Sequence, residues 1–255
     1  MQFTNTNDAA LLKFKGLIYG PPGVGKTTLA RTVKALGKTL IISCESGLAP
    51  LKGESIDVVE VKTIAELSEV VRALATNDAV LAPYDVIYWD SLTEAGKIIE
   101  SDLFAKFSEQ DDNGVRAVPK KANFAFYGAL GRQLEGLVRI VRDTKKHVFF
   151  SALPKSWQND ETGERGVRPA YGSSSVGELL PGMFDFVFAY RLVNHPETGE
   201  PHRMLFTETV EGWAAKARQE WDKPVLPKVL SNPDLSKIVN RIVGSAPAPA
   251  PQENA

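Results

Sequence analysis

The feature that most constrains the fold of this chain is a glycine-rich run at residues 20–27, which reads GPPGVGKT. It follows the apolar stretch Leu17-Ile18-Tyr19 and precedes apolar residues at helical spacing. The run has the form G-x-x-x-x-G-K-[ST], and a strand, this loop and a helix together indicate a phosphate-binding P-loop. The glycines let successive backbone N–H groups surround a polyphosphate, because no Cβ atoms stand in the way. A glycine-rich turn without a ligand is the plain alternative.

The P-loop predicts binding of ATP and Mg²⁺. Lys26 is expected to reach the β- and γ-phosphates, and the Thr27 hydroxyl to hold the metal ion. A helix is expected from Thr28 to Leu36, with Gly37 as its stop. The predicted nucleotide-binding residues are Gly20, Pro21, Pro22, Gly23, Val24, Gly25, Lys26, Thr27 and Thr28.

Composition limits the possible partners and location. The chain has 255 residues, of which 43% are hydrophobic, so we expect one domain at residues 1–243 and a disordered Pro/Ala tail at 244–255. Thirty basic residues stand against 31 acidic ones, so any contact with nucleic acid must be local. The single cysteine, Cys44, excludes an internal disulfide and suits a cytoplasmic protein. No signal peptide or membrane-spanning segment is expected.

The order of apolar segments predicts an α/β fold with a mainly parallel sheet flanked by helices. Segments 17–19, 39–44, 58–61, 86–89 and 147–150 are expected to be strands. Helices are expected over 64–74 and 130–141, where apolar residues recur at helical spacing. Segments 186–193 and 203–209 predict a β-hairpin that extends the sheet, and a last helix is expected from Asn232-Pro233 to Val243.

A second nucleotide motif ends at Asp90, after the apolar run Val86-Ile87-Tyr88-Trp89. It is typical of a Walker B strand, whose terminal aspartate holds the Mg²⁺ shell. Hydrolysis also needs a group that activates the attacking water, usually a carboxylate. In many P-loop ATPases a glutamate directly follows the aspartate, whereas this chain has Ser91, which argues against an AAA+ protein.

Glu45 is the candidate for that carboxylate. It follows the strand after the P-loop helix, in the run Cys44-Glu45-Ser46-Gly47. In this respect the chain resembles the RecA-like ATPases and, more specifically, the phage nucleotide-binding P-loop ATPases that include RecA-like single-strand annealing proteins. The resemblance covers residues 15–243 and rests on GPPGVGKTT, CESG, VIYWDSLTE, HVFFSA, RPA, LLPGMFDFVF and AKAR.

The resemblance implies roles for several residues. Glu45 would be catalytic, with a solvated loop carboxylate as the alternative and Glu94 as the rival base. Ser151 would stand where relatives carry a polar sensor of the γ-phosphate, although they often have His or Gln there. Lys216 and Arg218 resemble a K-x-R element that reaches a neighbour's γ-phosphate, which would require a ring or filament. A solvated surface pair is the alternative.

Local basic charge suggests where single-stranded DNA would bind. Residues 115–155 carry nine basic side chains against two acidic ones. Four of them, Arg132, Arg139, Arg142 and Lys146, are expected on one face of a helix, where a solvated surface is the usual explanation. The resemblance implies DNA-binding loops at about residues 102–123 and 154–181. The second contains cations and aromatic residues, which single-strand binding uses, although acidic residues dilute both loops.

These observations together predict a RecA-like P-loop ATPase that hydrolyses Mg·ATP and acts on single-stranded DNA in phage recombination or annealing, in the host cytoplasm. Two alternatives stay open. One is a replication helicase-type motor, which would need a further DNA-processing domain. The other is a nucleotide-dependent assembly or switch protein with little turnover.

Overall fold

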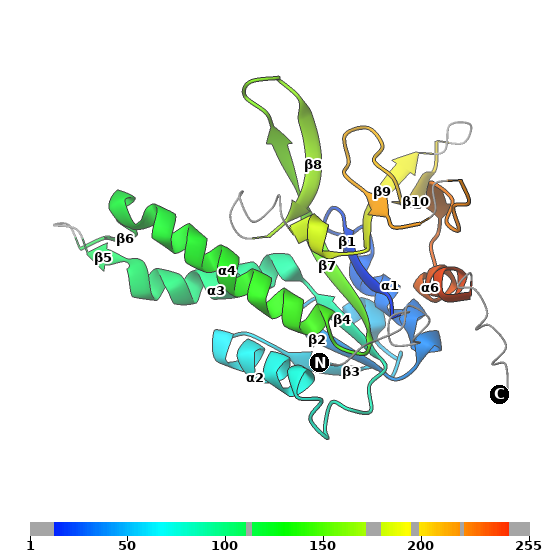
Figure 1. Cartoon of the computed structure of the whole chain (residues 1–255), viewed down its shortest axis with the longest axis horizontal. Helices are drawn as coiled ribbons and strands as arrows, with labels where there is room; N and C mark the ends of the chain where they lie inside the picture. Colours follow the sequence, from blue (N-terminus) through cyan, green and yellow to red (C-terminus); the bar gives the residue numbers. More distant parts are fainter. Residues whose placement is uncertain (1–12, 111–113, 172–179, 195–198, 220–221, 245–255) are drawn as a thin grey trace, which may run out of the picture.

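The structure is a computed structural model that describes residues 13–110, 114–171, 180–194, 199–219 and 222–244. A central sheet is covered by helices on both faces (Figure 1). Its strands follow the order β12-β10-β9-β1-β7-β4-β2-β3. The six parallel strands are β1 (Lys15–Tyr19), β2 (Thr39–Ser43), β3 (Asp57–Glu60), β4 (Val86–Asp90), β7 (His147–Gln158) and β9 (Phe186–Asn194). The predicted mainly parallel α/β fold is therefore confirmed.

Antiparallel strands extend one side of the sheet. β10 (Pro201–Phe206) pairs with β9, and β12 (Val229–Ser231) pairs with β10. The short β11 (Lys216–Ala217) pairs with the start of β9. The predicted hairpin between β9 and β10 is thus present, while its tip at residues 195–198 lies outside the described residues.

Side chains of the parallel strands alternate between two cores, as the two-residue period of a strand requires. On β4, Ile87 and Trp89 pack in the core beneath α2 (Ile64–Ala75), α3 (Leu92–Phe107) and α4 (Asn123–Arg142). Val86 and Tyr88 enter the opposite core, beneath the helical segment after the P-loop and α6 (Leu235–Gly244). All four side chains are fully buried. The P-loop and its helix therefore lie on the opposite face of the sheet from α2, α3 and α4.

Two predicted helices differ from expectation. The helix after the P-loop begins at Lys26 as α1 (Lys26–Leu29) and continues as the 3-10 helix η2 (Ala30–Leu36). The last helix begins at Leu235 rather than at Asn232-Pro233, because the Asp234 carboxylate accepts the backbone N–H groups of residues 236 and 237 and caps it. Helix α2 matches its predicted range and begins with a capping box between Thr63 and Glu66.

The two segments predicted as DNA-binding loops contain regular structure. Helix α3 runs to Phe107 and is followed by the small hairpin of β5 (Glu109–Gln110) and β6 (Arg116–Ala117), then by η4 (Lys120–Ala122). With α4 this forms an arm that projects from the body, which we call the helical arm (Figure 1). Strand β7 continues past the sheet to pair with β8 (Arg165–Ala170), and the two form a projecting β-hairpin (Figure 1).

Some predictions fall on residues that are not described, namely residues 1–12, the serine-rich stretch 172–175 and the tail after Gly244. The short segments η3 (Ala49–Leu51) and η5 (Leu180–Met183) complete the described elements. Within the described part of the chain, none of the helices combines the length and apolar character that a bilayer crossing demands.

Candidate nucleotide-binding site

The P-loop connects the end of β1 to α1 and has the backbone that its glycines permit. Gly23 and Gly25 have φ values of 75° and 103°, which side-chain-bearing residues rarely adopt. Gly20 is required for a different reason, since a Cβ atom there would lie 2.0 Å from the Tyr190 carbonyl oxygen of β9. The loop is thereby held against the neighbouring strand with its backbone open toward solvent at Gly23.

Lys26 lies inside the loop and is 7% exposed. Its Nζ donates hydrogen bonds to the carbonyl oxygens of Gly20 and Pro21 at 2.7 and 3.0 Å. Burial lowers the pKa of Lys26, while the carboxylates of Asp90 and Glu45 oppose that shift. The lysine ammonium is therefore enclosed by the loop and by the two carboxylates that sequence analysis singled out.

Asp90, at the end of β4, is 3% exposed and its two oxygens have separate partners. Thr27 Oγ1 donates to Asp90 Oδ2 at 2.6 Å. The Ser151 hydroxyl donates to Oδ1, and Ser151 is fully buried. The structure thus places Ser151 against the aspartate at the end of β4, and its role as a γ-phosphate sensor stays a prediction.

Glu45 and Glu94 both line the cavity at the P-loop, but their partners differ. Glu45 Oε1 accepts a 2.6 Å hydrogen bond from the Ser91 hydroxyl. Glu94 Oε1 instead forms a 2.6 Å ion pair with Lys97. Ser91 also caps α3, because its hydroxyl accepts the backbone N–H of Glu94. The residue that occupies the expected glutamate position therefore orients Glu45 from the neighbouring strand.

One cavity of about 600 Å³ brings together Lys26, Thr27, Glu45 and Glu94. Cys44 is part of its wall, and burial raises the pKa of this thiol to about 12, so it stays protonated. The cavity is lined by Pro22, Gly23, Gly25, Lys26, Thr27, Thr28, Cys44, Glu45, Ser46, Gly47, Pro50, Glu94 and Leu153.

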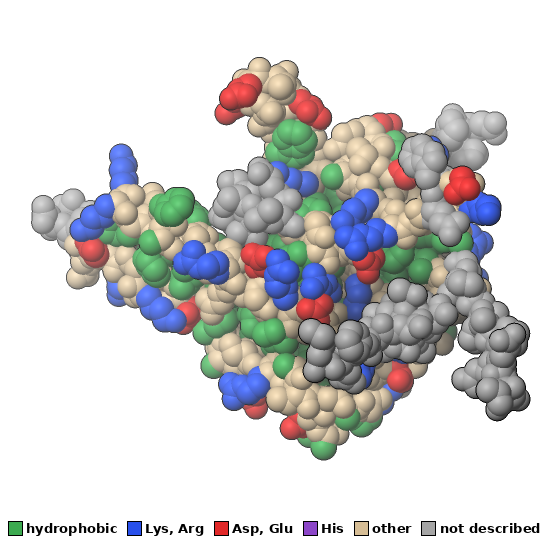
Figure 2. All heavy atoms as spheres, in the orientation of Figure 1, with side chains coloured by type: hydrophobic (Ala, Val, Ile, Leu, Met, Phe, Trp, Pro, Cys, Tyr) green, Lys and Arg blue, Asp and Glu red, His purple; other side chains and the backbone are tan. Residues whose placement is uncertain are grey.

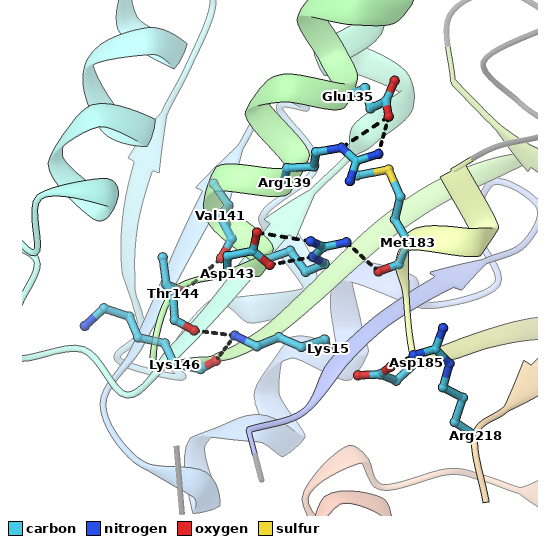
Figure 3. Close-up of polar contacts among 11 residues, drawn as sticks. Lys15, Glu135, Arg139, Val141, Asp143, Thr144, Lys146, Met183, Asp185 and Arg218 are labelled. Atoms are coloured by element: carbon cyan, nitrogen blue, oxygen red, sulfur yellow. Dashed lines mark hydrogen bonds and ion pairs between the residues drawn. The ribbon is translucent and has the colours of Figure 1, made fainter. Parts of the chain in front are cut away.

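Lys216 and Arg218 lie at a different edge of the sheet from the P-loop. Arg218 Nη1 forms a 2.9 Å ion pair with Asp185, the residue before β9 (Figure 3). Lys216 pairs through its backbone with Val187 near the start of β9, and burial lowers its pKa. Because β9 runs parallel to β1, the start of β9 and the P-loop are at opposite ends of these strands. Neither cation lines the P-loop cavity of its own chain.

The basic side chains of residues 115–155 are not one continuous surface. Helix α4 ends at Arg142, so Lys146 is not on the predicted helical face. Lys146 is 6% exposed and donates to two backbone carbonyls, while Arg139 pairs with Glu135 at 2.5 Å. The tip of the β7–β8 hairpin carries acidic side chains (Figure 2). These observations correct the predicted basic face and argue against phosphate binding at that tip.

Sequence analysis missed two residues that hold the P-loop from outside. Tyr88 is fully buried on β4, and its hydroxyl donates to the Lys26 carbonyl at 2.7 Å. Arg203 on β10 donates through Nε to the Val24 carbonyl at 2.9 Å. Tyr88 belongs to the apolar run before Asp90, but no motif signals its contact with Lys26, and none marks Arg203, because each reaches the loop only through the pairing of strands distant in sequence.

A parallel sheet with a glycine cradle, a buried lysine and a facing Thr–Asp pair after β1 and β4 defines a P-loop NTPase. Comparison with known families identifies the branch: a family model described as an AAA domain matches residues 12–219. The chain belongs to this family of AAA-type P-loop ATPase domains, which bind nucleotides. The inference from Ser91 against an AAA-type protein was therefore wrong.

Proposed function

We propose that this chain is an ATPase that binds and hydrolyses Mg·ATP in the P-loop cavity. The observation that carries the proposal is that one cavity is lined by Lys26, by Thr27 with Asp90 hydrogen-bonded behind it, and by the Ser91-bound carboxylate of Glu45. A nucleotide-binding switch would need the first two features only. Hydrolysis needs, in addition, a carboxylate that can activate water, and Glu45 is such a carboxylate, held by the Ser91 hydroxyl.

The residues present fit a bound Mg²⁺. The Thr27 hydroxyl and an Asp90 carboxylate oxygen lie 2.6 Å apart, and both are hard oxygen ligands. Described residues include no group of three or more His, Cys, Asp or Glu side chains that could hold a metal ion alone. That suits Mg²⁺, which binds through one or two protein oxygens, waters and phosphates. When bound, the ion would neutralise charge on the phosphates.

The protein side chains then divide the work. Lys26 neutralises phosphate charge at the base of the cradle. Glu45 accepts a proton from the attacking water, and Ser91 keeps its carboxylate aimed into the cavity. Asp90 is held by Thr27 and Ser151, so it stays fixed beside the metal position.

We further propose that Lys216 and Arg218 complete the site of a neighbouring subunit. Both cations are remote from their own P-loop cavity, and Arg218 is 66% exposed at its side chain. A cation placed against transferring phosphate stabilises the charge of the transition state. Hydrolysis would then depend on self-association into a ring or filament.

We propose that the protein binds single-stranded DNA. The sequence resemblance implies that it acts in phage recombination or annealing. The described residues favour the end of the helical arm as its contact. Phe124 is 93% exposed and Tyr127 44% exposed, and both follow the exposed lysines Lys120 and Lys121. Exposed aromatic rings stack on bases while lysines neutralise phosphates, which is the usual chemistry of sequence-tolerant single-strand binding.

Measuring ATP hydrolysis with and without Mg²⁺ tests the core of the proposal. Lys26→Ala should abolish turnover and ATP-dependent DNA binding, whereas Lys52→Ala, at an exposed lysine of another loop, should change neither. Full turnover in Lys26→Ala would refute the assignment of the site. A switch protein would instead keep partner binding in Lys26→Ala and show little turnover in the wild type.

The neighbour and DNA roles need separate measurements. Arg218→Ala alone should be inactive, and mixing it with Lys26→Ala should partly restore turnover by pairing intact half-sites. Absence of rescue at every mixing ratio would count against a role in trans. Single-stranded DNA should stimulate hydrolysis less at high salt, and Phe124→Ala should lose that stimulation while Ile140→Ala, also exposed on α4, keeps it. Equal stimulation of both variants would exclude the arm.

A further inference from the structure

The projecting β7–β8 hairpin begins at the wall of the P-loop cavity (Figure 1). Strand β7 pairs with β1 as far as Ala152 and continues beyond the sheet to Gln158, paired with β8. Leu153, the first β7 residue of the hairpin, lines the cavity. The carbonyl of Ala152 accepts the backbone N–H of Gly20, in the P-loop, at 3.2 Å. One strand therefore runs from the P-loop and its cavity into the hairpin.

Thr93, in the first turn of α3, holds the residue pair at the base of this hairpin. Its hydroxyl donates to the Ala170 carbonyl of β8 at 2.6 Å and accepts the Leu153 N–H of β7 at 2.9 Å. Leu153 and Ala170 are opposite each other in the pairing of the two strands. A single hydroxyl therefore bridges both strands of the hairpin and fixes them to α3.

The same turn of α3 carries groups of the proposed catalytic site. Ser91, two residues before Thr93, donates to Glu45 Oε1 at 2.6 Å, and Glu94, which directly follows Thr93, lines the cavity. The turn is held together because the Ser91 hydroxyl and carbonyl accept the N–H groups of Glu94 and Ala95. A shift of Thr93 would therefore also shift Ser91 and, through it, the Glu45 carboxylate.

Tyr19 supplies a second, independent connection between the hairpin and the site. It is the last residue of β1, directly before the P-loop, and it is fully buried. Its hydroxyl donates to the carbonyls of Val167, on β8, and Ala214 at 3.1 and 2.8 Å. The N–H of Ala214 in turn donates to the Val167 carbonyl. The hairpin is thus attached by one hydroxyl beside each of the two nucleotide motifs.

We propose that Thr93 is a positioning residue, which aligns Glu45 for hydrolysis by fixing Ser91 to the base of the β7–β8 hairpin. The inference rests on the ATPase function proposed above and adds a route by which the projecting hairpin controls the rate of hydrolysis. Loss of the Thr93 hydroxyl separates the α3 turn from the hairpin, whereas Lys26 and Thr27 keep their own contacts. Because coupling between two sites is reciprocal, a nucleotide in the cavity also stabilises the hairpin.

Thr93→Val tests this role, because valine has the shape of threonine without the hydroxyl. We expect kcat for ATP hydrolysis to fall about tenfold, while the KM for ATP stays within about twofold of wild type. Thr93→Ser keeps a hydroxyl and should restore most of the rate. Thr144→Val is the matched control and should keep the wild-type kcat. Thr144 is half-buried between α4 and the start of β7, and its hydroxyl donates to the Val141 carbonyl at 2.8 Å.

Hydrogen–deuterium exchange supplies a readout that a merely structural role would not move. In the wild type, Mg²⁺ with a non-hydrolysable ATP analogue should slow amide exchange at residues 153–158 and 165–170 by about fivefold or more. Thr93→Val should lose this effect of the nucleotide, although it still binds the analogue. If Thr93→Val does not fold, Tyr19→Phe removes the second hydroxyl and should lose at least about half of the protection.

Several outcomes would overturn the inference and leave the proposed ATPase intact. They are a wild-type kcat in Thr93→Val, an equal loss of kcat in Thr144→Val, and hairpin exchange in the wild type that does not respond to the nucleotide. Full nucleotide-dependent protection in Tyr19→Phe would do the same where Thr93→Val cannot be prepared. Wild-type protein that neither binds nor hydrolyses ATP would refute the proposed function and this inference with it.

Discussion

Replacement of Ser91 by alanine tests how Glu45 is oriented. The Ser91 hydroxyl is fully buried and donates to Glu45 Oε1 at 2.6 Å. A hydrogen bond to a charged group contributes about 1.5–3 kcal/mol. If this bond serves to aim the carboxylate at water, its loss should lower kcat by about 10- to 100-fold. The KM for ATP should change little, because Ser91 does not line the cavity.

Ser91 also caps α3, so the same substitution costs about 1 kcal/mol of stability. Thr63→Ala is the matched control, because Thr63 caps α2 in the same way and has no contact with Glu45. Single-turnover hydrolysis at saturating ATP, with thermal unfolding in parallel, separates the two effects. A wild-type kcat in Ser91→Ala, or an equal loss in Thr63→Ala, would refute the orienting role.

Three further predictions concern neighbouring features. His147 Nδ1 accepts the Phe14 backbone N–H, and burial lowers the pKa of this imidazole from 6.5 to about 4. The contribution of His147 to the free energy of unfolding is therefore complete above pH 6.5 and falls by about 3 kcal/mol as the pH drops to 4. Denaturant unfolding should show that slope, and His147→Asn, which keeps an acceptor without titrating, should flatten it. Glu94→Gln should leave steady-state hydrolysis within about twofold of wild type, because the Glu94 carboxylate already forms an ion pair with Lys97. A loss of about 100-fold, as expected when a general base is removed, would identify Glu94 as the base. Leu134→Ala, at a fully buried site, should cost about 2–5 kcal/mol by thermal unfolding, and a change below 1 would contradict the packing.

Local sequence patterns predicted much of the fold because each pattern has a direct physical cause. The apolar run at residues 86–89 forms β4, and the helical spacing at 64–74 forms α2. The P-loop is recognisable because its glycines, lysine and threonine are adjacent in sequence. Helix α3 was not predicted. Two of its five buried residues, Ala95 and Gly96, are small, so its buried face is only weakly more apolar than its exposed face.

The remaining parts of the site depend on contacts between distant segments. Ser91 contacts Glu45 because β2 and β4 are neighbours in the sheet. In the sequence, Ser91 was notable only because no glutamate follows Asp90. Ser151 meets Asp90 through the adjacent β7. Arg203 and Tyr190 reach the P-loop region through β10 and β9, far along the chain. The order of the strands in the sheet determines these contacts, and no local sequence pattern specifies that order.

The central claim is that Glu45 activates water for hydrolysis of ATP bound at the P-loop. The most direct measurement is ATP binding together with single-turnover hydrolysis in Glu45→Gln, which keeps an oxygen that can accept from Ser91. We predict unchanged binding of Mg·ATP and a loss of hydrolysis of about 10²- to 10⁴-fold, the usual contribution of a positioned base. Hydrolysis at the wild-type rate in Glu45→Gln would contradict the account.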